Sequence, residues 1–225
     1  MFLGHYGAAY ALKRVEPRVS LGTLFLSVAL VDTMWGVFLL AGWERARVNP
    51  GLTPVTPLEF ISYPLTHSLV AAVAWALLAA AIVYTWPTRD TSRHHWLKAL
   101  VVGVAVASHW FLDLIVHLPD LPLVGDDSTR LGLGLWRSLP ATIAVELLVF
   151  IVGFLIYLRW RLARGRARLG RIFLLAALLV GVYAASLVSP PPSSMKMVAV
   201  AAIIGTLTLA VLAAWADRST PKVKA

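Results

Sequence analysis

The chain has 225 residues, of which 59% are hydrophobic and 14% are charged, and its mean hydropathy is +0.78. A soluble core of this size needs far less apolar sequence, so the composition excludes an ordinary soluble protein and indicates one that crosses the membrane several times. The absence of cysteine excludes disulfides, thiolate metal sites and a cysteine nucleophile, which leaves nitrogen and oxygen ligands for any metal.

Apolar segments follow one another along the whole chain. The first, Met1 to Leu12, precedes Lys13 and Arg14, which reverses the order of charged and apolar regions in a cleavable signal. It is too short to cross a bilayer of about 30 Å, so we expect a retained, half-inserted helix. Six later runs approach the roughly 20 residues that a span needs: Ser20–Gly42, Pro64–Trp86, Leu97–Leu118, Leu139–Leu158, Ile172–Ser189 and Met197–Trp215.

Short connections join these runs, so we predict an all-α polytopic bundle of about six spans that forms one integral membrane domain over residues 1–225. The net charge of +9 follows the topology of these connections. Most Lys and Arg residues precede the first span, flank residues 89–98, fill residues 159–171 or follow the last span. By the positive-inside rule, both termini face the cytoplasm of a bacterial-type cytoplasmic membrane. The expected partners are membrane lipids, with no nucleic acid, and the oligomeric state stays open.

The third run carries three ionisable side chains that share one helix face. His109, Asp113 and His117 stand at positions i, i+4 and i+8, and each step of four residues turns a helix by about 400°. With a rise of about 1.5 Å per residue, Asp32 and His67 in the neighbouring spans fall at nearly the same depth. Ionisable groups are costly in the bilayer and commonly mark functional sites.

Each of these groups also has a simpler interpretation as a hydrogen-bond partner between packed helices. Agreement in depth favours a shared metal site, and helix tilt brings His5 of the N-terminal segment toward Asp32. Glu146 falls near the same depth, but it can instead pair with Arg137 at the membrane surface. The predicted ligands are His5, Asp32, His67, His109 and Asp113.

Four short blocks, in order, resemble the YdjM-like family of membrane-bound metal-dependent hydrolases. They are Gly4-His5, Leu30-Val31-Asp32, Thr66-His67-Ser68, and Ser108-His109 through Asp113 followed by the segment Pro119 to Leu123. The resemblance covers about residues 1–125, whereas residues 139–215 add further spans. The chain departs from the family pattern where Tyr63 and Pro64 replace a His and an Arg, and where Thr33 replaces a second Asp. These departures are compatible with one ion instead of two, another substrate, or lost catalysis.

The resemblance implies a metal-dependent hydrolase, which we expect to act on a lipid or lipid-linked ester or phosphoester. A divalent ion, with zinc as the first choice, would polarise the reacting oxygen. Glu146 is the expected proton-shuttling catalytic residue, and Thr66, Ser108 and His117 are expected to support the ligands. Three alternatives remain: a metal-ion or proton-coupled transporter that uses the same cluster, haem ligation by His67 and His109, and a non-catalytic scaffold that keeps the metal for stability.

Overall fold

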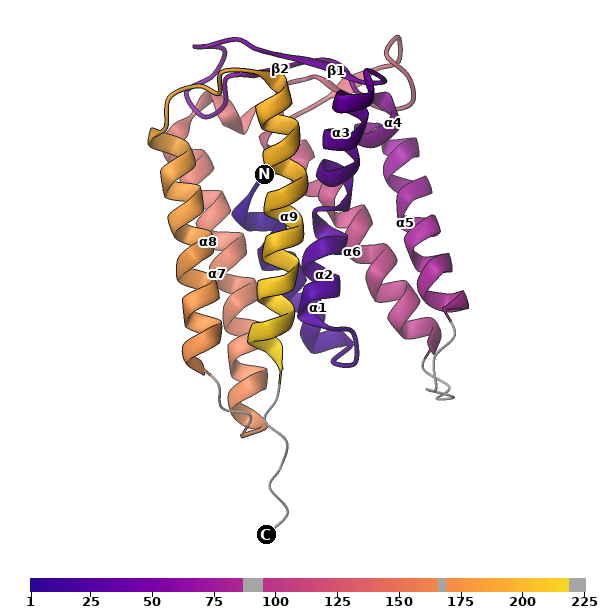
Figure 1. The fold of residues 1–225 in the computed structure, drawn as a ribbon, viewed down its shortest axis with the longest axis vertical. Coiled ribbons are helices and arrows are strands. Elements are labelled where there is room, and N and C mark those ends of the chain that lie inside the picture. Colours follow the sequence, from indigo (N-terminus) through magenta and orange to yellow (C-terminus); the bar gives the residue numbers. More distant parts are fainter. Residues whose placement is uncertain (87–94, 166–168, 219–225) are drawn as a thin grey trace.

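The computed structural model describes residues 1–86, 95–165 and 169–218, and Figure 1 shows a bundle whose longer helices run side by side. In chain order the elements are α1 (Leu3–Val15), α2 (Leu21–Val28), α3 (Leu30–Ala41), β1 (Arg45–Val48), β2 (Leu58–Ser62), α4 (Pro64–His67), α5 (Leu69–Thr85), α6 (His95–Val116), β3 (Leu121–Pro122), β4 (Arg130–Leu131), the 3₁₀ helix η1 (Leu135–Arg137), α7 (Leu139–Ala163), α8 (Leu169–Val188) and α9 (Met195–Asp217).

The helices identify an integral membrane protein, but they do not confirm six spans. Among the described residues, α6, α7, α8 and α9 are long and apolar enough to cross a membrane. The pair α2 and α3 becomes a fifth candidate if it counts as one span bent by 53°. The second predicted run is divided at Ser68, whose extended backbone ends α4 and whose side chain accepts a hydrogen bond from the Ala71 amide to cap α5. The remaining helix, α5, has only 17 residues and is therefore short for a span.

The short helix α1 packs against α7, α2 and α6, and its N-terminus lies in the upper half of the bundle in Figure 1. Its side chains Leu3, Tyr6 and Tyr10 are buried in the main hydrophobic core. Two glycines let α1 lie directly against α7, because a Cβ atom on Gly153 would fall 1.9 Å from the carbonyl oxygen of Gly7. Contact between these backbones leaves no room for even one methyl group, so the glycines fix the position of the helix that carries His5.

The two ends of the bundle differ in structure and charge. At one end, which we name the strand end, lie the antiparallel pairs β1–β2 and β3–β4 together with the connection from α8 to α9 (Figure 1). At the other, which we name the basic end, lie the last turns of α1, α7 and α9 and the first turn of α8 (Figure 1). Arginines gather at this basic end: Arg14, Arg159, Arg164 and Arg171.

Candidate metal centre

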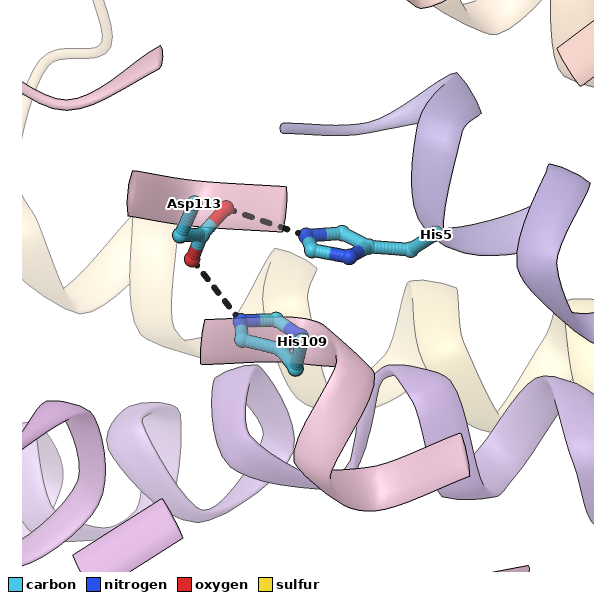
Figure 2. A group of neighbouring side chains, drawn as sticks. All are labelled: His5, His109 and Asp113. Carbon is cyan, nitrogen blue, oxygen red and sulfur yellow. Dashed lines mark ion pairs between the residues drawn. The ribbon is translucent and has the colours of Figure 1, made fainter. Parts of the chain in front are cut away.

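Five predicted ligands from α1, α3, α4 and α6 meet in the half of the bundle nearer the strand end. Two groups of three have ligand atoms that all lie within 4.8 Å of one another. One group joins Asp32, His67 and His109, and the other, drawn in Figure 2, joins His5, His109 and Asp113. His109 belongs to both groups. The predicted juxtaposition is thus present, although the chain reaches it through helices that are more broken than the sequence indicated.

The distances within the cluster suit the coordination shell of a small cation. In the first group, the Asp32 Oδ1 atom lies 3.4 Å from Nε2 of His67 and 3.5 Å from Nε2 of His109. In the second, the two oxygens of Asp113 lie 3.1 Å from Nε2 of His5 and 3.0 Å from Nε2 of His109. Ligand bonds of about 2.0–2.1 Å in tetrahedral geometry place neighbouring ligand atoms roughly 3.3 Å apart. The observed separations bracket that value.

Buried nitrogens in the cluster lack hydrogen-bond partners. Among the described residues, Nε2 of His109 and both ring nitrogens of His5 are buried without one, and the short approach of His5 to Asp113 lacks hydrogen-bond geometry. An unpaired buried polar atom is costly, and such atoms are rare in folded proteins. Imidazole nitrogens and carboxylate oxygens are the ligands that zinc and similar divalent ions accept without cysteine. The residues therefore fit a divalent cation.

The break between α2 and α3 determines which nitrogen of His109 faces the cluster. In an unbroken helix the Val28 carbonyl would accept from the amide of Asp32, four residues later. With the break at Ala29, the Val28 carbonyl instead lies 2.7 Å from Nδ1 of His109. A carbonyl can only accept, so Nδ1 carries the proton and Nε2 keeps its lone pair for an ion. The helix break thus frees the Val28 carbonyl, and this carbonyl orients His109 with Nε2 toward the cluster.

His67 is oriented by a chain of hydrogen bonds that begins at Glu44, a residue that no sequence pattern singled out. The Glu44 carboxylate accepts from the Thr66 amide at 2.9 Å and from the Thr66 hydroxyl at 2.7 Å. The same hydroxyl lies 2.8 Å from Nδ1 of His67. Above the Glu44 pKa of about 7, the ionised carboxylate takes the hydroxyl proton, so the Thr66 oxygen accepts from Nδ1 and Nε2 of His67 is free to bind an ion. Thr66 thus contacts one of the predicted ligands.

Replacing Thr66 with valine tests this chain. The change keeps the side-chain shape but removes the hydroxyl that holds His67 in its ligand tautomer. We expect divalent-metal affinity to fall by about 10–100-fold, the range found when groups that orient metal ligands are removed. Thr66→Ser, which keeps the hydroxyl, serves as the matched control and should bind metal nearly as well as wild type. Titration calorimetry in detergent measures both affinities, and wild-type affinity in Thr66→Val would contradict the orienting role.

Glu44 itself should give the fold a pH dependence. Burial raises the pKa of Glu44 to about 7 from an ordinary value of 4.5, with a further contribution from Asp126, and the hydrogen bonds from Thr66 oppose the shift. Since the folded state then favours the neutral acid, it binds more protons than the unfolded state between these pH values. The resulting stabilisation is complete below about pH 4.5 and is lost as the pH rises through about 7.

The measurement is the thermal midpoint of the wild type minus that of Glu44→Gln, which cannot titrate. We expect this difference, recorded with a chelator present, to decrease steadily from pH 5 to pH 8. A difference that increases over the same range would mean that the hydrogen bonds to ionised Glu44 outweigh its burial.

His117 joins the cluster through a second oriented pair. Its Nδ1 atom donates to Asp120 at 2.9 Å, so its Nε2 atom, 3.7 Å from Asp113 Oδ2, keeps a lone pair toward the cluster. Tyr63, which stands where the family pattern has a histidine, is fully buried and donates to the same Asp120 oxygen at 3.0 Å. Burial and the nearby Asp120 raise the pKa of Tyr63, so its hydroxyl stays protonated and donates.

Two other expected residues have different contacts. The Ser108 hydroxyl donates to the carbonyl of Ala105 in its own helix at 2.7 Å, instead of contacting a ligand side chain. The Glu146 carboxylate accepts from the amides of Phe2 at 2.8 Å and Gly4 at 2.9 Å, and within the described residues it forms no ion pair with Arg137. Glu146 thus satisfies free amides at the start of α1, the helix that positions His5.

Asp32 marks the open side of the cluster. Its side chain is 39% exposed, whereas the side chains of His67 and His109 are 2% exposed or less. A substrate or an entering ion can therefore approach past α3 more readily than from the other directions.

No family model, curated protein or solved structure matches the chain. The resemblance to the YdjM-like family therefore depends on the four sequence blocks.

Proposed function

We propose that the protein is an integral membrane hydrolase that uses one divalent cation, with zinc the best candidate, to cleave a lipid or lipid-linked ester or phosphoester. The observation that carries the proposal is the convergence of buried Nε2 atoms, of which those of His5 and His109 lack a hydrogen-bond partner, with carboxylate oxygens at separations that suit metal ligands. The apolar helices around the cluster favour a substrate that resides in the membrane. The same proposal places both termini in the cytoplasm, because the connections on that side carry most of the Lys and Arg residues.

One ion for each chain is the expected stoichiometry. The two groups of ligands share His109, and its Nδ1 atom is occupied by the Val28 carbonyl. Only Nε2 is left, so the groups offer alternative ligands around one position and cannot each hold an ion at the same time. This agrees with the departures from the family pattern at Thr33, Tyr63 and Pro64, where polar groups are missing.

The chain supplies a suitable base beside the cluster. A divalent cation, when bound, supplies Lewis-acid polarisation of a carbonyl or phosphoryl oxygen. His117 would accept a proton from the attacking water through Nε2, because Asp120 fixes its Nδ1 proton and would stabilise the imidazolium. Glu146, the expected shuttle, is less available because its oxygens accept the Phe2 and Gly4 amides. We therefore assign the base to His117 in this proposal.

Transport of the ion is the second candidate, and a specific feature favours it. The helices interrupted at Ala29 and Ser68 flank Asp32 and His67, and discontinuous helices are typical of transporter binding sites. Ion flux into proteoliposomes, abolished by His109→Ala, would favour transport over hydrolysis.

Haem ligation fits the geometry poorly. The His67 and His109 rings lie 5.5 Å apart with their planes at 71°, and both Nε2 atoms face the same Asp32 oxygen. Two histidines that ligate one haem must place their Nε2 atoms on opposite faces of the porphyrin, pointing toward the iron. Here both Nε2 atoms instead converge on one carboxylate oxygen, which leaves no space for a porphyrin between them. A purified protein without a Soret band would remove this alternative.

The test of the hydrolase proposal is a broad panel of phospholipids and lipid esters presented to the purified, reconstituted protein. We expect cleavage of at least one class, its loss with a chelator, and its return when zinc is added. His109→Ala should be inactive, whereas His95→Ala, a histidine change at the other end of α6, should retain activity. If no member of the panel is cleaved with metal present, the enzyme proposal fails, and the flux measurement decides whether transport replaces it.

A further inference from the structure

A groove on the outside of the bundle, between α1 and α7, is separate from the candidate metal centre. Its upper part, a cavity of about 270 Å³, is almost wholly apolar and is lined by Gly7, Ala11, Leu148 and Gly153, among others. Its lower part, of about 540 Å³, reaches the basic end, where Arg14 and Arg159 join the lining. Val152 and Ile156 line both parts, so the two cavities form one continuous groove.

The groove exists because α1 and α7 approach each other so closely. Where Gly7 meets Gly153, neither helix has a side chain to fill the angle between the two backbones. The neighbouring Leu148, Val152 and Leu155 are exposed, so the walls of the groove are apolar surface on a membrane helix. Such a surface needs an apolar occupant in the bilayer.

The length of the groove suits one leaflet of the bilayer. From Leu148 to Arg159, eleven residues along α7 rise about 16 Å. Half of a hydrocarbon core of about 30 Å is roughly 15 Å. An acyl chain that follows the groove from the middle of the membrane would therefore bring its headgroup to the level of the arginines.

The charges at the basic end select the headgroup. Arg14 and Arg159 are exposed, and within residues 1–86, 95–165 and 169–218 neither forms an ion pair or a hydrogen bond. A third guanidinium, that of Arg164, lies 4.7 Å from the centre of the Trp160 ring, which also lines the groove. An indole at the membrane interface beside cations is a common setting for lipid headgroups.

Nearby carboxylates do not neutralise these arginines. Glu16 binds Arg18 at 2.7 Å, and Asp217 binds Lys13 at 2.7 Å and Arg161 at 3.2 Å. The mouth of the groove thus keeps a positive charge, which a phosphate diester would complement. We propose that the α1–α7 groove binds one anionic phospholipid, with an acyl chain along Gly7 to Ile156 and the phosphate between Arg14 and Arg159.

The experiment titrates the full-length protein in detergent with phosphatidylglycerol or phosphatidylcholine of identical acyl chains and counts bound lipids by native mass spectrometry. We expect one molecule of phosphatidylglycerol to bind at least about tenfold more tightly than phosphatidylcholine. Arg14→Gln combined with Arg159→Gln should remove this preference, since each juxtamembrane cation contributes substantially to binding anionic lipid. Both side chains are exposed, so the variant should fold, and its thermal midpoint is recorded as a check.

Two further variants distinguish a groove from a charged surface. Arg171→Gln removes one positive charge at the basic end, where Arg171 stacks 4.4 Å from the Trp215 ring, outside the groove. It should leave the preference intact. Ala11→Phe keeps all arginines but fills the apolar part, and should weaken phosphatidylglycerol binding by about tenfold. Equal losses in Arg171→Gln and the double variant, no preference in wild type, or unchanged binding in Ala11→Phe would each overturn the proposal.

Discussion

Replacing His109 with alanine should abolish stoichiometric metal binding, with affinity reduced by more than about 100-fold. The expectation follows from the position of its Nε2 atom, which lies 3.5 Å from Asp32 and 3.0 Å from Asp113 and belongs to both groups of candidate ligands. Loss of a group that merely orients a ligand costs about 10–100-fold, so loss of the shared ligand should cost more. Elemental analysis of the detergent-purified protein by mass spectrometry measures the bound metal.

Two further variants distinguish the loss of a ligand from a general disturbance of the fold. His109→Ala also removes the donor to the buried Val28 carbonyl, so Asp113→Asn, which preserves side-chain shape, provides an independent loss of one ligand. His95→Ala, at the start of the same helix, is the matched control and should retain one metal ion for each chain. Wild type without metal after reconstitution, or full metal content in both site variants, would mean that these side chains serve packing or proton transfer.

Much of this site was accessible to sequence reasoning because one helix supplies its centre. The spacing of His109, Asp113 and His117 depends only on helical periodicity, and the structure keeps all three close, with Asp113 Oδ2 3.0 Å from His109 and 3.7 Å from His117. The depth of Asp32 and His67 required only the helical rise. That estimate assumed continuous spans, and the residues still meet although the spans of Asp32 and His67 are interrupted at Ala29 and Ser68.

The helix breaks were not accessible in the same way. Ala29 interrupts the first predicted span although alanine is the best helix former, and no glycine or proline marks the position. The break is compensated by a contact between the Val28 carbonyl and His109, 81 residues later, so it results from tertiary structure. Ser68 caps α5 and so divides the second predicted span. A hydropathy count assumes a continuous helix there and does not detect the break.

The hydrogen-bond partners of Glu44 and Glu146 could not be predicted from the sequence either. Glu44 lies just beyond a span, where an acidic residue is expected to face water, yet it is 1% exposed because the strand end folds over it and Thr66 caps its charge. The sequence suggested Arg137 as a partner for Glu146, whereas the partners are backbone amides more than 140 residues away. Backbone donors carry no sequence signal, so such a contact cannot be inferred from residue types.

Replacing Glu146 with alanine should destabilise the fold by about 2–5 kcal/mol, because it leaves the amides of Phe2 and Gly4 without an acceptor and each unpaired buried amide costs about 1–3 kcal/mol. The loss falls at the start of α1, one residue before His5, so metal affinity should fall as well. Glu146→Gln, which retains a carbonyl acceptor, should be intermediate. Glu59→Ala, which breaks the exposed pair with Arg47, is the matched control and should leave the unfolding midpoint almost unchanged.

The same variant separates two roles of Glu146 that the sequence could not distinguish. If Glu146 caps α1, then Glu146→Ala lowers the thermal midpoint, the metal affinity and any hydrolysis together, and added zinc restores part of the activity by mass action. If Glu146 instead shuttles protons, the variant keeps its midpoint and its metal while losing turnover. Under that outcome His117 would no longer be needed as the base, and His117→Ala should retain activity. The first amides of α1 donate to the Glu146 carboxylate, and the α1 backbone packs against Gly153. We therefore expect that Glu146→Ala lowers the thermal midpoint and the metal affinity together.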